Sequence, residues 1–226
     1  MKAPSRSRAG GAFLPLPSPT ELRRRAPRLL TGLVAMGTGI ATMVLAGLGL
    51  GPWDVLHQGL ADRTGVPIGT VGIVVGVALL VLWVPLRQRL GVGTVVNTIL
   101  IGLTIDAVLA VAPDLEPLWL RWVGMLAGVG LYAGGSALYI GAGLGPGPRD
   151  GLMTGLAERG SSIRLVRTGI ELTVLVLGWA LGGTVGIGTV VLALSVGPLL
   201  QLFLGWFTLP PLVPATTVPE DPHPPV

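Results

Sequence analysis

Six long and almost uncharged apolar runs constrain the fold of this chain more than any other feature. They cover Leu29–Gly49, Pro67–Leu86, Val92–Val111, Trp122–Ala142, Leu165–Val185 and Gly188–Leu209. Each run is about as long as the 20 residues that an α-helix needs to cross a bilayer. Only 12% of the 226 residues are charged and the mean hydropathy is +0.75, whereas about a quarter of a soluble domain is charged. The sequence therefore predicts an all-α, polytopic membrane bundle with six transmembrane helices.

Two polar, proline-rich segments flank this membrane region. Residues 1–27 are basic and contain five prolines, so we expect a disordered cytoplasmic arm. Residues 210–226 are predicted to form a proline-rich disordered tail. A cleaved signal peptide is the alternative interpretation of the basic start. The first apolar run is long for a signal peptide and has a counterpart in mid-chain, and both facts oppose cleavage.

The region between these segments contains an internal repeat. A shift of 96 positions aligns Ala46–Arg63 with Ala142–Arg159, and most positions are identical. A shift of 95 positions then aligns the G-V-G-T-V-V that begins at Gly91 with the G-I-G-T-V-V that begins at Gly186. We therefore divide the chain into membrane repeat 1, residues 28–114, and membrane repeat 2, residues 115–209.

Each repeat is predicted to hold three spans and one short helix. The short segments Trp53–Arg63 and Arg149–Arg159 have 11 residues each, enough for about half of a 30 Å hydrocarbon core. We therefore expect each to be an interrupted or re-entrant helix. Three spans per repeat is an odd number, so the second repeat should be inverted in the membrane. The alternative of eight crossings would place charged residues in two spans of only 11 residues, which is costly.

The arginines support this topology. With a cytoplasmic N-terminus, all lysines and arginines except Arg63 and Arg121 fall on the cytoplasmic side, as the positive-inside rule requires of short loops. The net charge of +4 is thus explained by orientation in the membrane, and no nucleic-acid partner is expected. We predict a multi-pass protein of the bacterial inner membrane with both termini in the cytoplasm.

Three short motifs resemble a known family. They are G-L-G-x-G-P-W-D-V-L before the second run, G-x-G-T-x-x-N from Gly91 to Asn97, and the pair Ile105-Asp106 in the third run. Together they resemble the YczE/YyaS/YitT family of bacterial membrane proteins over residues 29–204. The resemblance implies a small multi-span membrane protein and assigns no functional residues.

The repeated G-P-x-D motif has two interpretations. Proline at the first helical position and an acid two residues later are typical of a helix start. Alternatively, two chain breaks inside a membrane would face one polar site, as in transporters with inverted repeats. Under this hypothesis the substrate-binding residues are Gly51, Pro52, Asp54, Asn97, Asp106, Gly147, Pro148 and Asp150. The carboxylates favour a cation and the helix N-termini an anion, so the charge of the ligand stays open.

Other chemistries are poorly represented. The chain has no cysteine, and His57 near Asp54 would supply too few ligands for a metal, because Met153 occupies the matching position. Ser136 has no histidine in any span to activate it. Glu171 and Arg167 are four residues apart and should pair along one helix. We expect no enzyme, no cofactor and no metal.

We therefore hypothesise a small-solute transporter or channel of unknown substrate, with a site between the two repeats. The alternative is a non-transporting membrane regulator or assembly partner, since the chain has almost no soluble domain. The expected partners are the lipid bilayer and a small solute or ion, and a homo-oligomer is left open.

Overall fold

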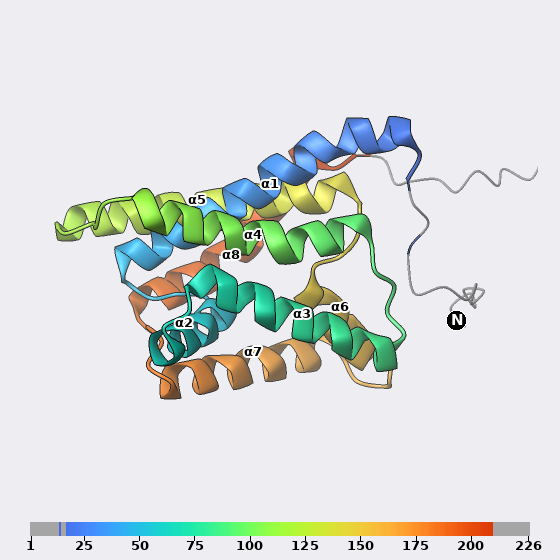
Figure 1. Ribbon diagram of the computed structural model, residues 1–226. Helices are drawn as coiled ribbons and strands as arrows, with labels where there is room; N and C mark the ends of the chain where they lie inside the picture. The colour runs from blue at the N-terminus through green and yellow to red at the C-terminus, as the bar shows by residue number, and fades with distance from the viewer. Residues whose placement is uncertain (1–13, 15–16, 210–226) are drawn as a thin grey trace, which may run out of the picture.

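The computed structural model describes residue 14 and residues 17–209, and the described part folds into eight helices (Figure 1). They are α1 (Pro19–Ala46), α2 (Pro52–Thr64), α3 (Ile68–Leu86), α4 (Val92–Val111), α5 (Leu118–Ala142), α6 (Pro148–Ala157), α7 (Ile163–Ala180) and α8 (Ile187–Phe207). The predicted all-α membrane bundle is confirmed at this level.

Five helices are long and apolar enough to cross a membrane: α1, α3, α4, α5 and α8. The sixth predicted span corresponds to α7, whose 18 residues include Arg164, Arg167 and Glu171. The charged residues of α1, by contrast, all lie within its first ten residues and leave a long uncharged stretch. The short helices α2 and α6 have 13 and 10 residues, which correspond to about 20 and 15 Å of helix. Neither could cross a hydrocarbon core of about 30 Å.

The start of α1 corrects the predicted N-terminal arm. The helix begins at Pro19, eight residues before the end of the segment expected to be disordered, and it continues through Pro27. The Ser18 side chain accepts a hydrogen bond from the Glu21 backbone N–H while Glu21 accepts from the Ser18 N–H. This capping box starts the helix and offsets the unfavourable proline. Residues 1–13 of the arm and the tail at 210–226 lie outside the described residues.

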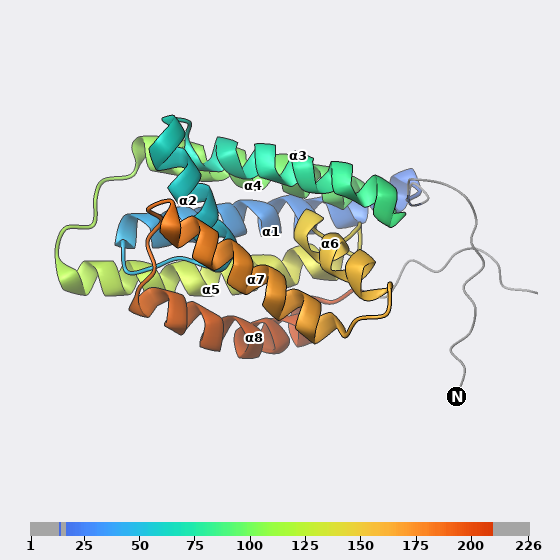
Figure 2. The ribbon, with the colours of Figure 1, turned by 90° about the horizontal axis from the view of Figure 1, so that it is seen from below.

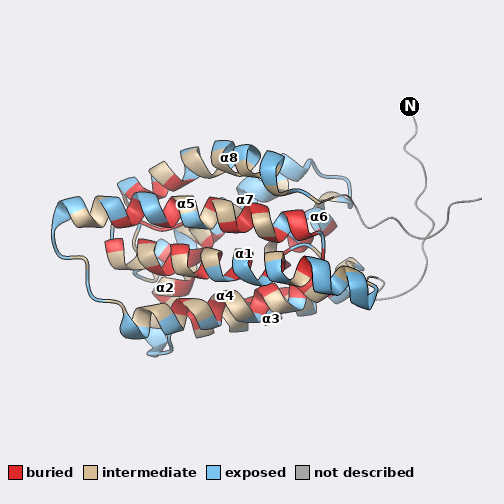
Figure 3. Cartoon of the chain, turned by 90° about the horizontal axis from the view of Figure 1, so that it is seen from above, coloured by how far each residue is buried: buried red, intermediate tan, exposed pale blue. Residues whose placement is uncertain are grey.

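The helices form two layers. In one layer α4, α1, α5 and α8 lie side by side in that order, as Figure 3 shows. In the other layer α2 and α6 lie between α3 and α7, toward opposite ends of the bundle (Figures 1 and 2). Each short helix packs against the third helix of the other repeat, α2 on α7 and α6 on α3. The two repeats are thus interlocked.

Glycines bring the two central helices together. A Cβ atom added to Gly32 of α1 would lie 2.7 Å from the backbone oxygen of Gly135 in α5, and one added to Gly39 would lie 2.6 Å from that of Gly128. Added Cβ atoms on Gly128 and Gly135 would meet α1 just as closely. Small residues at these crossings let the backbones approach, which is the main source of packing between helices in lipid.

Four arginines cap helices of the opposite repeat. Arg25 at the start of α1 donates to the Ala142 carbonyl at the end of α5 (2.8 Å), and Arg121 at the start of α5 donates to the Ala46 carbonyl at the end of α1 (2.6 Å). Arg63 donates to the Leu181 carbonyl, at the end of α7, and its repeat counterpart Arg159 donates to a carbonyl at the end of α3. Cationic groups at helix C-termini satisfy free carbonyls and the helix dipole.

The outward faces carry large apolar side chains. Val84, Val111, Leu172 and Leu194 are each more than half exposed, and in Figure 3 the buried positions gather on the facing sides of the helices. An exposed apolar surface of this extent is expected where lipid, rather than water, surrounds the helices. The structure is therefore consistent with contact with a bilayer.

Candidate functional site

Each glycine break is held by the G-[VI]-G-T motif of the other repeat. The Gly93 N–H donates to the Leu144 carbonyl in the second break (2.9 Å), and the Gly188 N–H donates to the Leu48 carbonyl in the first (2.8 Å). The two hydrogen bonds are repeat equivalents. The motif shared by the repeats is therefore a backbone clamp that crosses from one repeat to the other.

The clamp explains why glycines recur in both motifs. Added Cβ atoms at Gly91 and Gly186 would collide with the backbone oxygens of Leu144 and Leu48. Gly49 and Gly145 have φ angles of +123° and +132°, which side chains rarely tolerate. Most of these glycines thus serve the close approach of two backbones.

The clamped breaks lead directly into the two short helices. Gly51 and Gly147 are the N-cap residues, and Pro52 and Pro148 occupy the first helical position, so the motif does start a helix, as the first interpretation predicted. One carboxylate oxygen of each aspartate lies back against its own N-cap. The Asp54 Oδ2 atom lies 3.3 Å from the position that a Cβ would take on Gly51. The Asp150 Oδ2 atom lies 3.2 Å from the corresponding position on Gly147.

The two helix starts meet inside the bundle through Arg149. Its guanidinium Cζ lies 5.2 Å from the centroid of the Trp53 ring, and its Nη2 atom lies 3.5 Å from Asp54 Oδ1. Arg149 and Trp53 are equivalent residues of the two repeats, at a shift of 96 positions. The structure thus brings Asp54 of one motif together with the second motif.

The side chains at the start of α2 are buried and incompletely paired. Trp53, Asp54 and His57 are 6%, 4% and 5% exposed. Within the described part of the chain, Trp53 Nε1, Asp54 Oδ1 and His57 Nε2 have no hydrogen-bond partner. The contact of Asp54 with Arg149 is longer than a charge-assisted hydrogen bond of about 2.8 Å. Buried polar atoms without partners are uncommon and indicate a ligand, water or a second conformation.

The start of α6 differs. Asp150 is exposed and lies within electrostatic range of Arg149, Arg167 and Glu171. Arg167 and Glu171 form the predicted pair on α7, with 3.0 Å between Nε and Oε1. Met153 takes the place of His57. The second motif therefore faces a more open and more charged surface than the first.

The helices beside the two motifs also differ in packing. In repeat 1, α3 packs along α4, and a Cβ on Gly102 would collide with the Gly69 backbone oxygen. In repeat 2, α7 barely touches α8, and the equivalent Gly197 has no atom within 4 Å. The seam between α7 and α8 is thus looser than the one between α3 and α4.

The remaining predicted residues separate into two places. Asn97 is buried beside the second motif, with its Nδ2 atom 3.9 Å from the position of a Cβ on Gly147. Asp106 instead accepts hydrogen bonds from the Gly69 N–H and the Thr70 hydroxyl, both at 2.7 Å. It caps the N-terminus of α3 and does not contact the side chains where the starts of α2 and α6 meet. Asp106 therefore has a structural task that accounts for its charge in the span.

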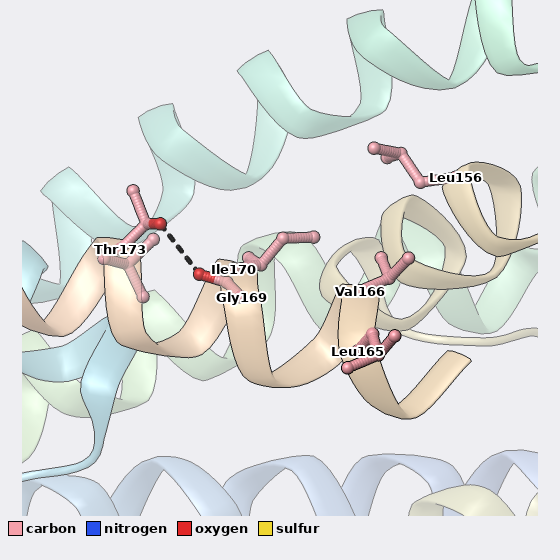
Figure 4. A pocket seen from close by; sticks show the side chains of 7 residues that line it. Leu156, Leu165, Val166, Gly169, Ile170 and Thr173 are labelled. Carbon is pink, nitrogen blue, oxygen red and sulfur yellow. Dashed lines mark hydrogen bonds between the residues drawn. The ribbon is translucent and has the colours of Figure 1, made fainter. Parts of the chain in front are cut away.

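Within the described residues, no recognisable metal site lies where the starts of α2 and α6 meet. No group of three or more His, Asp or Glu side chains is close enough to hold a metal ion in the described residues. A groove of about 320 Å³ runs along α7 and reaches Leu156 of α6, as Figure 4 shows. It is lined mainly by apolar side chains, and Thr173 bonds to the carbonyl of Gly169 within its own helix. Its composition suits an acyl chain better than a polar solute.

Sequence reasoning missed the central role of Trp53 and Arg149. They are equivalent positions of the two repeats, yet neither is among the residues expected at the site. Equivalent residues approach one another only where they lie near the axis that relates the two repeats, and the sequence alignment does not show which positions do. His57 was considered only as a metal ligand, although it is buried next to Asp54 and belongs with Trp53 and Asp54 to the buried polar side chains at the start of α2.

Comparison with known proteins agrees with this description. Residues 23–205 match the model of a family of unknown function, DUF6198. An uncharacterised protein of Haemophilus influenzae is 42% identical over 82% of this chain and 86% of its own length. The uncharacterised membrane protein YczE of Bacillus subtilis is 35% identical over 81% of this chain and 87% of its own length.

A further relative, the uncharacterised protein YyaS of Bacillus subtilis, is 29% identical over 76% of this chain and 89% of its own length. No solved structure matches the chain. These relatives confirm the resemblance to YczE and YyaS that the three motifs suggested. The chain therefore belongs to the DUF6198 family and is a membrane protein with several apolar helices.

Proposed function

We propose that this protein is a small-solute transporter of the cell membrane, with its site between the two repeats. In this proposal α7 is the sixth span, and α2 and α6 are re-entrant helices that enter from opposite faces of the bilayer. The observation that carries the proposal is the meeting of the two helix starts, where Arg149 of α6 contacts Asp54 and Trp53 of α2. Transporters with inverted repeats place their sites between interrupted helices.

The packing supports an inverted arrangement of the repeats. The reciprocal caps made by Arg25 and Arg121 join the start of each long helix to the end of the other, so α1 and α5 are antiparallel. Capping also supplies a reason for Arg63 and Arg121, the two exceptions to the positive-inside pattern. We place both termini in the cytoplasm, with the second repeat upside down relative to the first.

Cysteine labelling tests this topology. The natural chain has no cysteine, so single cysteines can be introduced without background. Asp62→Cys and Glu158→Cys change equivalent, exposed positions at the ends of α2 and α6. An impermeant maleimide added to intact spheroplasts should label the first and not the second. Equal labelling of both would contradict the inverted topology.

Reconstitution tests the transport activity. Purified protein in proteoliposomes should move at least one of a panel of organic cations, organic anions, amino acids and sugars. We call the contact of Arg149 with Trp53 and Asp54 the junction. Asp54→Asn should abolish this flux, because the variant lacks the carboxylate at the junction. Asp62→Asn is the matched control, since it removes the same charge from an exposed position on the same helix. Normal flux in Asp54→Asn would contradict the proposed site.

One observation favours the alternative of a non-transporting regulator or assembly partner. Both grooves described lie away from the junction, one along α7 and the other around Gln58 and Pro67. A regulator would co-purify with a partner protein, and no solute would change its melting temperature. A transporter seen in a closed state would instead respond to its solute in both flux and melting temperature.

A further inference from the structure

The contact between Arg149 and the start of α2 has the chemistry of a bound organic cation. The guanidinium lies over the Trp53 ring and beside the Asp54 carboxylate. An aromatic face with a carboxylate is the combination that proteins use to hold ammonium and guanidinium groups. Here the cation that fills this place belongs to the chain itself.

Arg149 fits this place loosely. Arginine and a carboxylate usually form two parallel hydrogen bonds of about 2.8 Å, whereas here a single 3.5 Å contact leaves Asp54 Oδ1 without a hydrogen bond. The Arg149 side chain is 30% exposed and the Asp54 side chain 6%, so the arginine covers a carboxylate that is otherwise inaccessible. An occupant held by one long ionic contact and a cation–π contact can be displaced without breaking a bidentate ion pair.

The charges around the junction set the sign of the ligand. Three carboxylates, those of Asp54, Asp150 and Glu171, lie near two guanidinium groups, those of Arg149 and Arg167. Burial favours the neutral form of the His57 imidazole. With all three carboxylates ionised, the junction carries one more negative than positive charge, and this arrangement favours one additional monovalent cation over an anion.

The loose seam of repeat 2 offers a route to the junction. Asp150, an exposed residue, lies at the start of α6, next to Arg149. The adjacent helices α7 and α8 barely touch, whereas α3 and α4 are closely packed. Asp150 also lies within electrostatic range of Arg167 and Glu171 on α7, so charged side chains extend from the junction toward this side of the bundle.

We propose that Trp53 and Asp54 form a binding site for a small organic monocation with a guanidinium or ammonium head, and that Arg149 occupies this site as an internal substitute until the ligand displaces it. This proposal rests on the proposed transport function and specifies the class of its solute. Inorganic divalent cations are disfavoured, because no three His, Asp or Glu side chains among the described residues lie close enough together to hold one.

Calorimetric titration of the full chain in detergent tests the site. Methylguanidinium and tetramethylammonium should each bind saturably and raise the melting temperature, whereas sodium chloride at equal ionic strength should do neither. Asp54→Asn should abolish binding. Trp53→Leu should weaken binding about tenfold through loss of the aromatic face.

The decisive variant is Arg149→Gln, which should bind the organic cation more tightly. If Arg149 leaves the site about one-tenth of the time, its removal improves the apparent affinity about tenfold. Arg164→Gln is the matched control, because it removes a charge from an exposed position on α7 and should leave the affinity unchanged. Unchanged or weaker binding in Arg149→Gln overturns the proposal, as does binding of phosphate or acetate that depends on Arg149.

A second variant covers a failure of Arg149→Gln to fold. Asp54→Asn combined with Arg149→Gln removes both charges of the pair, and it should fold but not bind methylguanidinium. Retained binding in this double variant overturns the proposal. Saturable cation binding without flux in proteoliposomes would support the site and contradict transport. Asp54-dependent flux of an uncharged or anionic solute would support transport and contradict the organic-cation site.

Discussion

The helix α2 begins among buried polar side chains, whereas its repeat counterpart α6 begins with an arginine and an exposed aspartate. Trp53, Asp54 and His57 in α2 correspond to Arg149, Asp150 and Met153 in α6. The backbones around these starts are nevertheless alike, with equivalent hydrogen bonds from Gly93 and Gly188. The repeats therefore share a scaffold and differ in the chemistry at its centre.

The two helix starts can differ in side chains because they lie next to the axis that relates the two repeats. The backbone clamp needs both copies, because each glycine break is held by the other repeat. A site on the axis needs only one copy of each chemical group, so equivalent positions are free to become complementary. Trp53 and Arg149 illustrate this by contacting each other. Trp83 and Gly151 are in contact, and so are their repeat counterparts, Gly178 and Val55. The large side chain thus comes from α3 in one contact and from α2 in the other.

The largest expected effect tests the shared scaffold. Gly91→Ala and Gly186→Ala should each lower the free energy of unfolding by about 3 kcal/mol or more, because the new methyl group collides with a backbone oxygen of the other repeat. Denaturant titration in mixed micelles measures this. Gly130→Ala is the control, since no atom lies within 4 Å of its Cβ position. A large loss for only one of the pair would break the symmetry of the clamp.

The next effect sharpens the contrast between the two seams. Gly102→Ala should destabilise the protein by about 2 kcal/mol, because its methyl group would collide with α3. The equivalent Gly197→Ala meets no other helix and should change stability little, since the helix preference of alanine is offset by crowding against the following Pro198. Comparing the two variants by thermal melting checks this. Equal losses would mean that α7 and α8 pack as closely as α3 and α4.

A smaller effect is expected for the reciprocal caps. Arg25→Ala and Arg121→Ala should each cost about 1.5 kcal/mol, because each leaves a helix-terminal carbonyl without its charged donor. Arg24→Ala, at an exposed position one residue from Arg25, is the control. The same micelle titration measures all three. A cost confined to one of the two caps would show that the ends of α1 and α5 are not equivalent.

The smallest effect concerns Asp106. Asp106→Ala should cost about 1 kcal/mol through the loss of the α3 cap, while Gln201→Ala, at the equivalent and exposed position on α8, should change stability little. Solute flux should persist in both variants, because Asp106 lies away from the junction. Loss of flux with normal stability would return Asp106 to the candidate site.

The sequence predicted the elements well because lipid leaves few options to a backbone. The span expected at Val92–Val111 coincides with α4, and the other predicted helices overlap those of the structure. The largest error was the start of α1, where a capping box and a proline at the first position favour helix in a segment interpreted from its basic, proline-rich composition. Local hydrogen bonding outweighed composition there.

The candidate site was predictable only in part. The repeated motif correctly located both helix starts, since proline and aspartate preferences act locally. Asp106 was grouped with them because charge in a span suggests function, yet its carboxylate is satisfied by α3, which is 36 residues away in the chain. A partner so distant cannot be inferred from spacing along one helix.

By itself, the sequence determined that this chain folds into apolar helices, that it consists of two related halves and where each half breaks, because length, hydropathy and glycine act through local geometry. Only the tertiary structure decided which aspartate is buried and that Arg149 lies against Trp53 and Asp54. It also decided that one seam is closed and the other loose. These properties depend on contacts between the halves, and a pattern that repeats along the chain does not record which copy faces inward.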